Sequence, residues 1–332
     1  MTIIITPEDN QILWEETLKN TYVDSLDCND ITYPFSSIMG DGYSREIKLT
    51  RGLTIEILNC DITQHYLLKN NETARDNIIF HFHLFGYHQD LDTIVNNQEF
   101  ALYGTGFVPQ QINEVPPQKV LEVNIHVDTE RLISYIGSKD GELPKPLHNF
   151  IKPLTRQSYA CVGKVTPMLE GILWQILRCP FQGITKRIYL EAKALELIGL
   201  VIAEQIEALS QESCYPKSSI EQCRCTIARI HSAKSILLAN LHQPPSIAEL
   251  ARQVQLNEYT LKQGFKEVFK TTIFDYLRNY RLQQAKQLLE TGQMGVKEVM
   301  NAVGYCDRHH FAMAFRKKFN VNPRDYLKGY RF

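Results

Sequence analysis

The chain has 332 residues and a net charge of -1, with 36 Lys and Arg residues against 37 Asp and Glu residues. This length exceeds what one hydrophobic core usually organises, so the sequence predicts two domains with connecting helices. No apolar run approaches the ~20 residues that span a bilayer, and the N-terminus lacks a basic-then-apolar signal pattern. We therefore expect a cytoplasmic protein without a membrane partner.

The charge is distributed unevenly along the chain. Residues 225–332 hold 17 Lys and Arg against 8 Asp and Glu, whereas residues 1–224 hold 19 against 29. A basic C-terminal part joined to an acidic remainder is typical of a module that binds a polyanion such as nucleic acid.

The first part of the chain has the pattern of a β domain. Short, often alternating apolar segments occur at residues 45–49, 53–58, 77–85 and 120–127. Turn formers such as Asp41 with Gly42, and Gly86, separate them. Several short strands in one stretch predict a cupin-like β-barrel or double-sheet domain, and with the helices that follow an α+β chain.

Two histidines, His81 and His83, lie two residues apart in segment 77–85, so in a strand they share one face. Such a pair can bind iron or zinc, with His65, His88 and His126 as candidates for a third ligand. Ordinary half-buried strand histidines are the favoured alternative, because no carboxylate spacing completes a cupin metal motif. The sequence therefore predicts no metal site, and we expect His81 and His83 to line a ligand cavity.

Helical patterns follow at residues 129–136, 166–177 and 185–209. In the last of these, one apolar stripe is formed by Tyr189, Ala192, Leu195, Ile198, Gly199, Ile202, Ile206 and Leu209. The stripe packs either within its own domain or against a second subunit, so a homodimer through helix 185–209 stays open. The polar segment 210–219 loses the periodicity. We therefore assign a sensor and dimerisation domain to residues 1–210, a linker to 211–222 and a further domain to 223–332.

The last domain contains an internal repeat. Residues 274–281 match residues 324–331 at an offset of 50, and residues 247–254 match residues 296–303 at an offset of 49. Each copy predicts a helix-turn-helix unit with a short first helix, a tight turn and a second helix. A single helix between the copies, ended at Gly292, would hold the two second helices at a fixed separation.

The second helices, residues 259–269 and 308–319, each have one apolar face with a step of four. The core residues are Leu261, Phe265, Phe269, Phe311, Phe315 and Phe319. The predicted base-reading residues near the helix N-termini are Tyr259, Lys262, Gln263, Arg308, His309 and Met313. The predicted phosphate contacts are Lys266, Lys270, Arg316, Lys317 and Lys318. Because successive major-groove faces lie about 34 Å apart, the two units can dock in adjacent grooves.

Residues 296–323 resemble the most specific stretch of the AraC/XylS family of bacterial regulators, and the resemblance covers residues 229–332. It implies a seven-helix DNA-binding domain with two helix-turn-helix motifs, binding to double-stranded promoter DNA, and activation through RNA polymerase without enzymatic activity. The departures from the family pattern are Met300, His309, Met313 and Asn320, where Ala, Ser, Arg and Gly are usual. Asn320 is a mild change, because Asn tolerates the left-handed conformation.

More narrowly, the whole chain, including residues 189–197, resembles the PchR-like branch of that family. This resemblance implies a small-molecule effector, a ferric siderophore or related iron ligand, a role in iron homeostasis, and no required cofactor. The alternative is a cupin-type metal-dependent enzyme with an appended DNA-binding domain, which the same histidines motivate. That alternative needs three convergent ligands.

Overall fold

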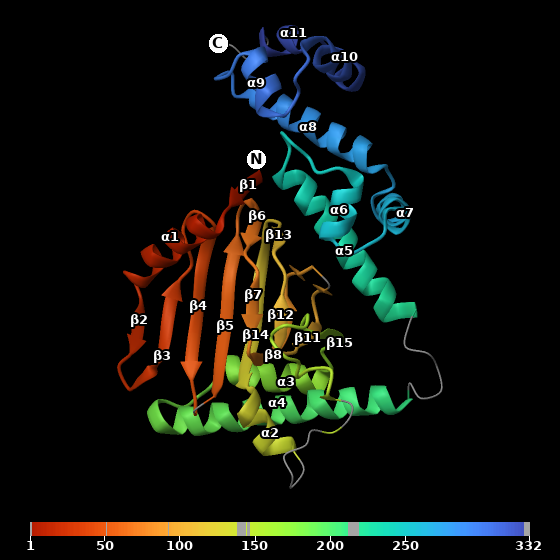
Figure 1. The fold of residues 1–332 in the computed structure, drawn as a ribbon. Coiled ribbons are helices and arrows are strands. Elements are labelled where there is room, and N and C mark those ends of the chain that lie inside the picture. Colours follow the sequence, from red (N-terminus) through yellow and green to blue (C-terminus); the bar gives the residue numbers. More distant parts are fainter. Residues whose placement is uncertain are drawn as a thin grey trace. The chain divides into compact units, whose positions relative to one another are not determined.

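The computed structural model describes residues 2–50, 52–91, 93–137, 144, 147–211 and 219–328. The chain forms two compact units, Ile3–Cys225 and Thr226–Phe332 (Figure 1). Helix α4 (Gly183–Gln211) is the last element of the first unit, and helix α5 (Ser219–Ala239) follows it. Residues 212–218, which include most of the predicted linker, lie outside the described residues.

The main element of the N-terminal unit is an eight-stranded antiparallel sheet with the order β15-β11-β8-β14-β5-β4-β3-β2. Its strands are β2 (Tyr22–Asp24), β3 (Asp27–Pro34), β4 (Gly40–Lys48), β5 (Leu53–Ile62), β8 (Asn77–Phe85), β11 (Glu99–Tyr103), β14 (Gln118–Asp128) and β15 (Ala160–Lys164). The four predicted strand segments correspond to β4, β5, β8 and β14.

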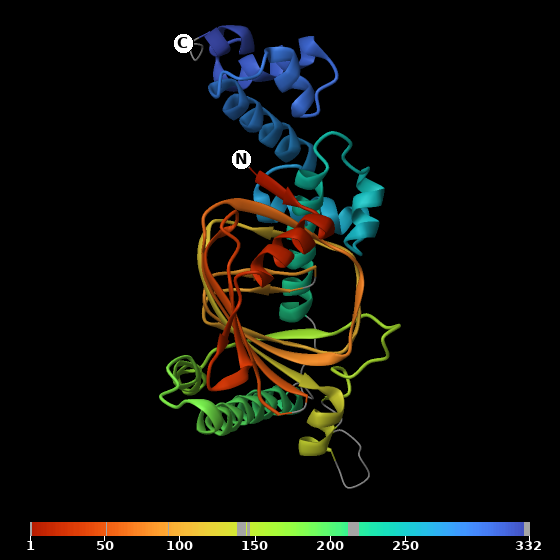
Figure 2. The ribbon, with the colours of Figure 1, turned by 90° about the vertical axis from the view of Figure 1, so that its left-hand side faces the viewer.

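Smaller sheets complete the β structure. They pair β1 (Thr2–Ile5), β6 (His65–Asn70) and β13 (Gln111–Val115); β9 (His88–Gln89) with β10 (Ile94–Val95); and β7 (Thr73–Arg75) with β12 (Gly106–Val108). Figure 2 shows that the strands curve around a common interior. The predicted α+β class with an N-terminal β-rich double-sheet domain is thereby confirmed.

One predicted turn is wrong. Asp41 and Gly42 lie inside β4, where they pair with Asp61 and Cys60 of β5. At Gly42 φ is 139°, and an added Cβ would lie 2.2 Å from the Asn59 carbonyl oxygen. The glycine therefore serves a close approach of two strands rather than a reversal of the chain.

Helices α2 (Thr129–Ile136), α3 (Pro167–Leu177) and α4 pack on one face of the large sheet and form the main core with it. The predicted stripe on α4 is confirmed at Ile198 and Ile202, which are buried in the core, and is shifted elsewhere. Leu190, Ala194, Leu197 and Val201 are buried as well, at steps of three and four, whereas the predicted Ala192 and Gly199 are exposed. Both stripes fit the helical period, and the position of the sheet decides which one is covered.

A buried ion-pair network joins α4 to the edge of the sheet. Lys186 on α4 is 3% exposed, and its Nζ lies 2.8 Å from Asp24 Oδ2 and 2.5 Å from Asp30 Oδ2. Arg45 on β4 donates two hydrogen bonds to the same Asp30 carboxylate, at 2.8 and 2.6 Å. Asp30 is thus surrounded by two cations that satisfy its charge.

The C-terminal unit is helical. Helix α5 is followed by α6 (Ile247–Gln253), α7 (Glu258–Phe269), α8 (Ile273–Glu290), α9 (Val296–Ala302), α10 (Arg308–Phe319) and α11 (Pro323–Lys328). The described residues of this unit thus form seven helices, the number that the family resemblance implies. None of the helices in the described part of the chain combines the length and apolarity that a bilayer span requires.

The two helix-turn-helix units repeat each other in backbone conformation as well as in sequence. The turn residues Gln255 and Gly304 both have positive φ, at 54° and 79°. Lys270 and Asn320, which follow the two second helices, have φ values of 57° and 58°. The left-handed conformation expected for Asn320 is therefore confirmed, and the duplication extends to the helix ends.

Candidate functional site

The second helix of the first unit is α7. Asn257 accepts a hydrogen bond from the Thr260 amide (2.8 Å) and caps the start of the helix. Leu261 and Phe265 are fully buried, so the opposite face of α7 is exposed. The exposed predicted DNA contacts on this helix are Tyr259, Lys262, Gln263 and Lys266.

The second unit repeats this arrangement on α10. Asp307 accepts a hydrogen bond from the His310 amide (2.6 Å), and Phe311 and Phe315 are fully buried. The exposed predicted contacts are Arg308, His309, Met313, Arg316 and Lys317. His310 is exposed as well, at 81% of its side chain, although the sequence analysis does not single it out.

Lys270 and Lys318 differ from the other predicted phosphate contacts. Lys270 is exposed but is the left-handed residue that ends α7. Lys318 donates from Nζ to the backbone oxygen of Asn279 (2.8 Å) and to its Oδ1 (3.3 Å), and partial burial lowers the pKa of Lys318. A phosphate contact by Lys318 would require its bond to α8 to break.

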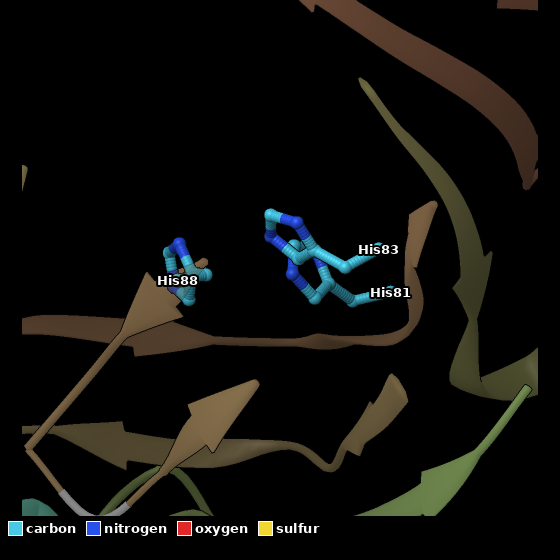
Figure 3. A group of neighbouring side chains, drawn as sticks. All are labelled: His81, His83 and His88. Atoms are coloured by element: carbon cyan, nitrogen blue, oxygen red, sulfur yellow. The ribbon is translucent and has the colours of Figure 1, made fainter. Parts of the chain in front are cut away.

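A second candidate site lies in the N-terminal unit, on β8. Phe80 and Phe82 point into the main core, and the alternating residues His81 and His83 point to the other face of the sheet. His81 is 5% exposed and His83 is 1% exposed. Figure 3 shows their rings beside each other, with His88 of β9 facing them.

The three rings form a compact cluster. Ring centroids are 4.7 Å apart for His81 and His83, 5.0 Å for His81 and His88, and 6.1 Å for His83 and His88. One ring nitrogen from each residue lies within 4.8 Å of the other two. Three imidazole nitrogens at this spacing are a candidate metal-ligand set.

Strand β14 adds polar groups that the sequence analysis does not assign to this site. In the sheet register Glu122 faces His83 and Asn124 faces His81. The Glu122 Oε2 atom lies 3.0 Å from His83 Nε2 and 4.0 Å from His81 Nε2, and Asn124 Oδ1 lies 2.6 Å from His81 Nδ1. The alternation of residues 122–127 predicts this polar face, but it does not predict which strand lies beside it.

Burial and charge act differently on the members of the cluster. Burial lowers the pKa of His81 to about 4. Burial alone would favour the protonated acid at Glu122, but the adjacent His81 and His83 imidazoles lower the pKa of Glu122 to about 2. Burial also opposes a charge on His88, yet Asp90, 3.2 Å from His88 Nε2, raises its pKa to about 9. At neutral pH the site without metal thus combines a neutral His81 with a protonated His88 and an ionised Glu122, so a metal ion that binds His88 must displace a proton from it.

The other two candidates for a third ligand lie apart from the cluster. His65 Nε2 is 2.8 Å from Glu114 Oε1. His126 Nε2 is 3.2 Å from Glu56 Oε2. The structure therefore brings His88 to the pair, and not His65 or His126.

Comparison with known proteins gives two family matches. The profile of the family "Regulatory protein PchR N-terminal domain" matches residues 39–218, just over half of the chain, and that of "Helix-turn-helix domain" matches residues 250–329. Regulatory protein PchR of Pseudomonas aeruginosa is 36% identical over 124 residues, which cover 36% of this chain and 39% of that protein. HTH-type transcriptional regulator AlkR of Acinetobacter baylyi is 31% identical over 103 residues, 30% of this chain and 34% of that protein. The chain thus spans about two fifths or less of the length of these two relatives.

Solved structures give weaker likenesses. An AraC-type transcriptional regulator from Chromobacterium violaceum has 28% identity and a TM-score of 0.28, and it covers 30% of this chain and 88% of that one. A single-residue variant of apo ToxT from Vibrio cholerae has 12% identity and a TM-score of 0.33, and it covers 86% of this chain and all of that one.

The two profile matches fall on the two units that the structure separates. Both profiles describe regulatory or DNA-binding domains, so the alternative of a metal-dependent enzyme is not retained. The chain belongs to the AraC-family DNA-binding transcription regulators, with a PchR-type N-terminal sensor domain and a C-terminal helix-turn-helix domain.

Proposed function

We propose that α7 and α10 enter adjacent major grooves of one promoter, and that the bound protein activates transcription in the cytoplasm through RNA polymerase. The observation that carries this proposal is the duplicated unit. Each second helix buries two aromatic or aliphatic residues and exposes a polar face, and matching backbone conformations begin and end it. Helix α8 packs on α7 through Tyr276, which contacts Phe265 and Phe269, and through Leu282, Ala285 and Leu289 it packs in the core of the second unit. A single helix that packs in both units would keep the two faces at one separation.

The exposed faces divide by position. Arg308 and Tyr259 stand in the first turns of their helices, where side chains reach base edges in helix-turn-helix proteins. Lys266 and Lys317 stand in the last turns, where an ammonium meets the phosphate backbone and supplies affinity without sequence information.

A footprint of the full-length chain on promoter DNA tests this arrangement. We expect two protected major-groove segments on the same side of the duplex, about 10–10.5 base pairs apart. Protection of a single groove, or of two grooves with unrelated spacing, would contradict simultaneous docking. Arg308→Ala and Lys262→Ala should each remove protection in one groove first.

For the sensor domain we propose a ferric siderophore as the effector. Support comes from the resemblance to PchR-like regulators and from the curved sheet, whose interior face carries His81 and His83. A second subunit on α4 is a further proposal, since Ile188 and Ile206 are 67% and 37% exposed there.

Fluorescence of Trp14 and Trp174 gives a direct assay for the effector. The probe is ferric pyochelin, because the PchR-like branch that the chain resembles is typified by a pyochelin-responsive regulator. Ferric pyochelin should quench the fluorescence with saturation, whereas the iron-free chelator and ferric citrate should not. The double variant His81→Ala, His83→Ala should weaken the response to ferric pyochelin. An unchanged response in the double variant would remove both histidines from the effector site.

A further inference from the structure

We propose that His81, His83 and His88, together with the Glu122 carboxylate, form a binding site for one divalent first-row transition metal inside the N-terminal sheet. This site shares His81 and His83 with the proposed effector site but binds a different ligand, because a ferric siderophore brings its own ligands to iron, whereas here protein side chains hold the ion. The three histidines come from β8 and β9, and Glu122 comes from β14.

The hydrogen bonds of the two buried histidines leave one nitrogen of each ring as a ligand. The Phe85 carbonyl can only accept, so His83 donates from Nδ1 at 3.2 Å and its lone pair lies on Nε2. His81 Nδ1 is bonded to Asn124 Oδ1 at 2.6 Å, which leaves Nε2 in the same role. Such second partners orient metal-bound imidazoles and fix their tautomer.

Both of these nitrogens are buried. Within the described residues His81 Nε2 has no hydrogen-bond partner, and the contact of His83 Nε2 is the Glu122 carboxylate oxygen at 3.0 Å. Buried polar atoms are normally paired, so the unpaired His81 nitrogen beside the contact of His83 with Glu122 indicates a missing partner.

Glu122 identifies that partner as a cation. Its Oε2 lies 3.0 Å from His83 Nε2, and a carboxylate oxygen and an imidazole lone pair repel each other at that distance. Either a proton or a metal ion must lie between them. The nearby nitrogen of His81, 4.0 Å from the same oxygen, favours a shared ion over a single proton.

The donor set defines the class of metal. Three imidazole nitrogens and one carboxylate suit Zn²⁺, Fe²⁺, Co²⁺ or Ni²⁺ rather than Ca²⁺ or Mg²⁺, which prefer oxygen ligands. Tetrahedral ligands at about 2.0–2.1 Å from zinc lie about 3.3 Å apart. The candidate ligand nitrogens lie within 4.8 Å of one another, so small rotations of the rings would bring them to that spacing. Asp90, 3.2 Å from His88 Nε2, supplies the carboxylate partner that metal-bound histidines often have.

The test uses the full-length chain, stripped with a chelator and then dialysed against Zn²⁺ or Co²⁺. We expect one metal per chain by elemental analysis, and with Co²⁺ a visible spectrum of nitrogen and oxygen ligation. The double variant His81→Ala, His83→Ala should lose the metal, and Glu122→Gln should bind it about tenfold more weakly or worse. The matched control is His126→Ala, which removes a histidine outside the cluster and should keep full stoichiometry.

A measurement on the unaltered chain covers the case in which a variant fails to fold. Imidazole ¹⁵N spectra should show the signals of three of the ten histidines shifted by Zn²⁺. Less than stoichiometric metal in the stripped and reloaded chain, unshifted histidine signals, or equal metal loss in His126→Ala would each overturn the proposal. In that event a proton, and not a metal ion, lies between His83 Nε2 and the Glu122 carboxylate. DNA footprints and ferric pyochelin binding are measured without added metal, so their failure is distinguishable from failure of this site.

Discussion

Gln255 and Gly304 occupy the same place in the two helix-turn-helix turns and share a left-handed backbone, at φ 54° and 79°. The two positions differ in the space around them. An added Cβ at Gly304 would lie 2.4 Å from the Leu241 carbonyl oxygen, which accepts a hydrogen bond from Arg281. At Gln255 the side chain is exposed, and its Oε1 accepts from Arg229. Close packing therefore requires glycine at position 304, whereas position 255 has room for a side chain.

Gln255→Gly should stabilise the C-terminal unit by about 0.5–1 kcal/mol. A left-handed conformation costs a residue with a Cβ roughly 1–2 kcal/mol, and the greater freedom of glycine in the unfolded chain offsets part of the gain. Scanning calorimetry of the full chain measures the shift. Gly304→Ala is the matched control and should destabilise by about 2–4 kcal/mol. Equal shifts for both substitutions would show that backbone conformation does not govern these turns.

Arg308→Ala and Lys317→Ala should weaken DNA binding in different ways. Loss of a base contact at Arg308 should cost ~1–3 kcal/mol on the specific promoter and relax the preference at one position. Loss of a phosphate contact at Lys317 should weaken all sequences alike and reduce the salt slope by about 1. Fluorescence anisotropy on promoter and random duplexes at several salt concentrations separates the two. Identical effects on random DNA would mean that the roles are misassigned.

Lys186→Met should destabilise the N-terminal unit by about 2–4 kcal/mol, because it leaves Asp30 buried with one cation fewer. The matched control is Lys193→Met on the same helix. Its ion pair with Glu196 is solvent-accessible, so the change should cost less than about 1 kcal/mol. Scanning calorimetry of the two variants compares their loss of stability. An equal loss in Lys193→Met would mean that helix propensity, and not the buried ion pair, causes the effect.

The same network should make the N-terminal unit sensitive to acid. Burial favours the protonated form of Asp30, but hydrogen bonds from Arg45 and Lys186 hold the pKa of Asp30 below its ordinary value of about 3.9. A lowered folded-state pKa means that the stabilisation is present above the unfolded value and is lost as the pH falls through the folded value. Asp30→Asn should therefore lower stability at pH 7 and flatten the loss below about pH 4. The exposed Asp41→Asn should leave the pH profile unchanged, and an unaltered profile in Asp30→Asn would remove Asp30 as the cause.

Local patterns predict the elements of this chain well where one period dominates. The repeat within residues 247–331 predicts the two helical pairs, and residues 129–136 coincide with α2. Where two apolar stripes of one helix both fit the helical period, the sequence does not decide which of them is buried. On α4 the stripe beginning at Tyr189 and the one beginning at Leu190 are both helical, and contact with the sheet covers the second.

The sequence by itself determined the duplicated second helices of the helix-turn-helix units, because their apolar periodicity is local and repeats at an offset of about fifty residues. It also placed His81 and His83 on one face of a strand, since alternation is a property of the strand alone. Only the tertiary structure decided that His88 and Glu122 join them. That choice depends on the register of β14 against β8 and on the path of β9, and both arise from pairing between strands that are distant in sequence.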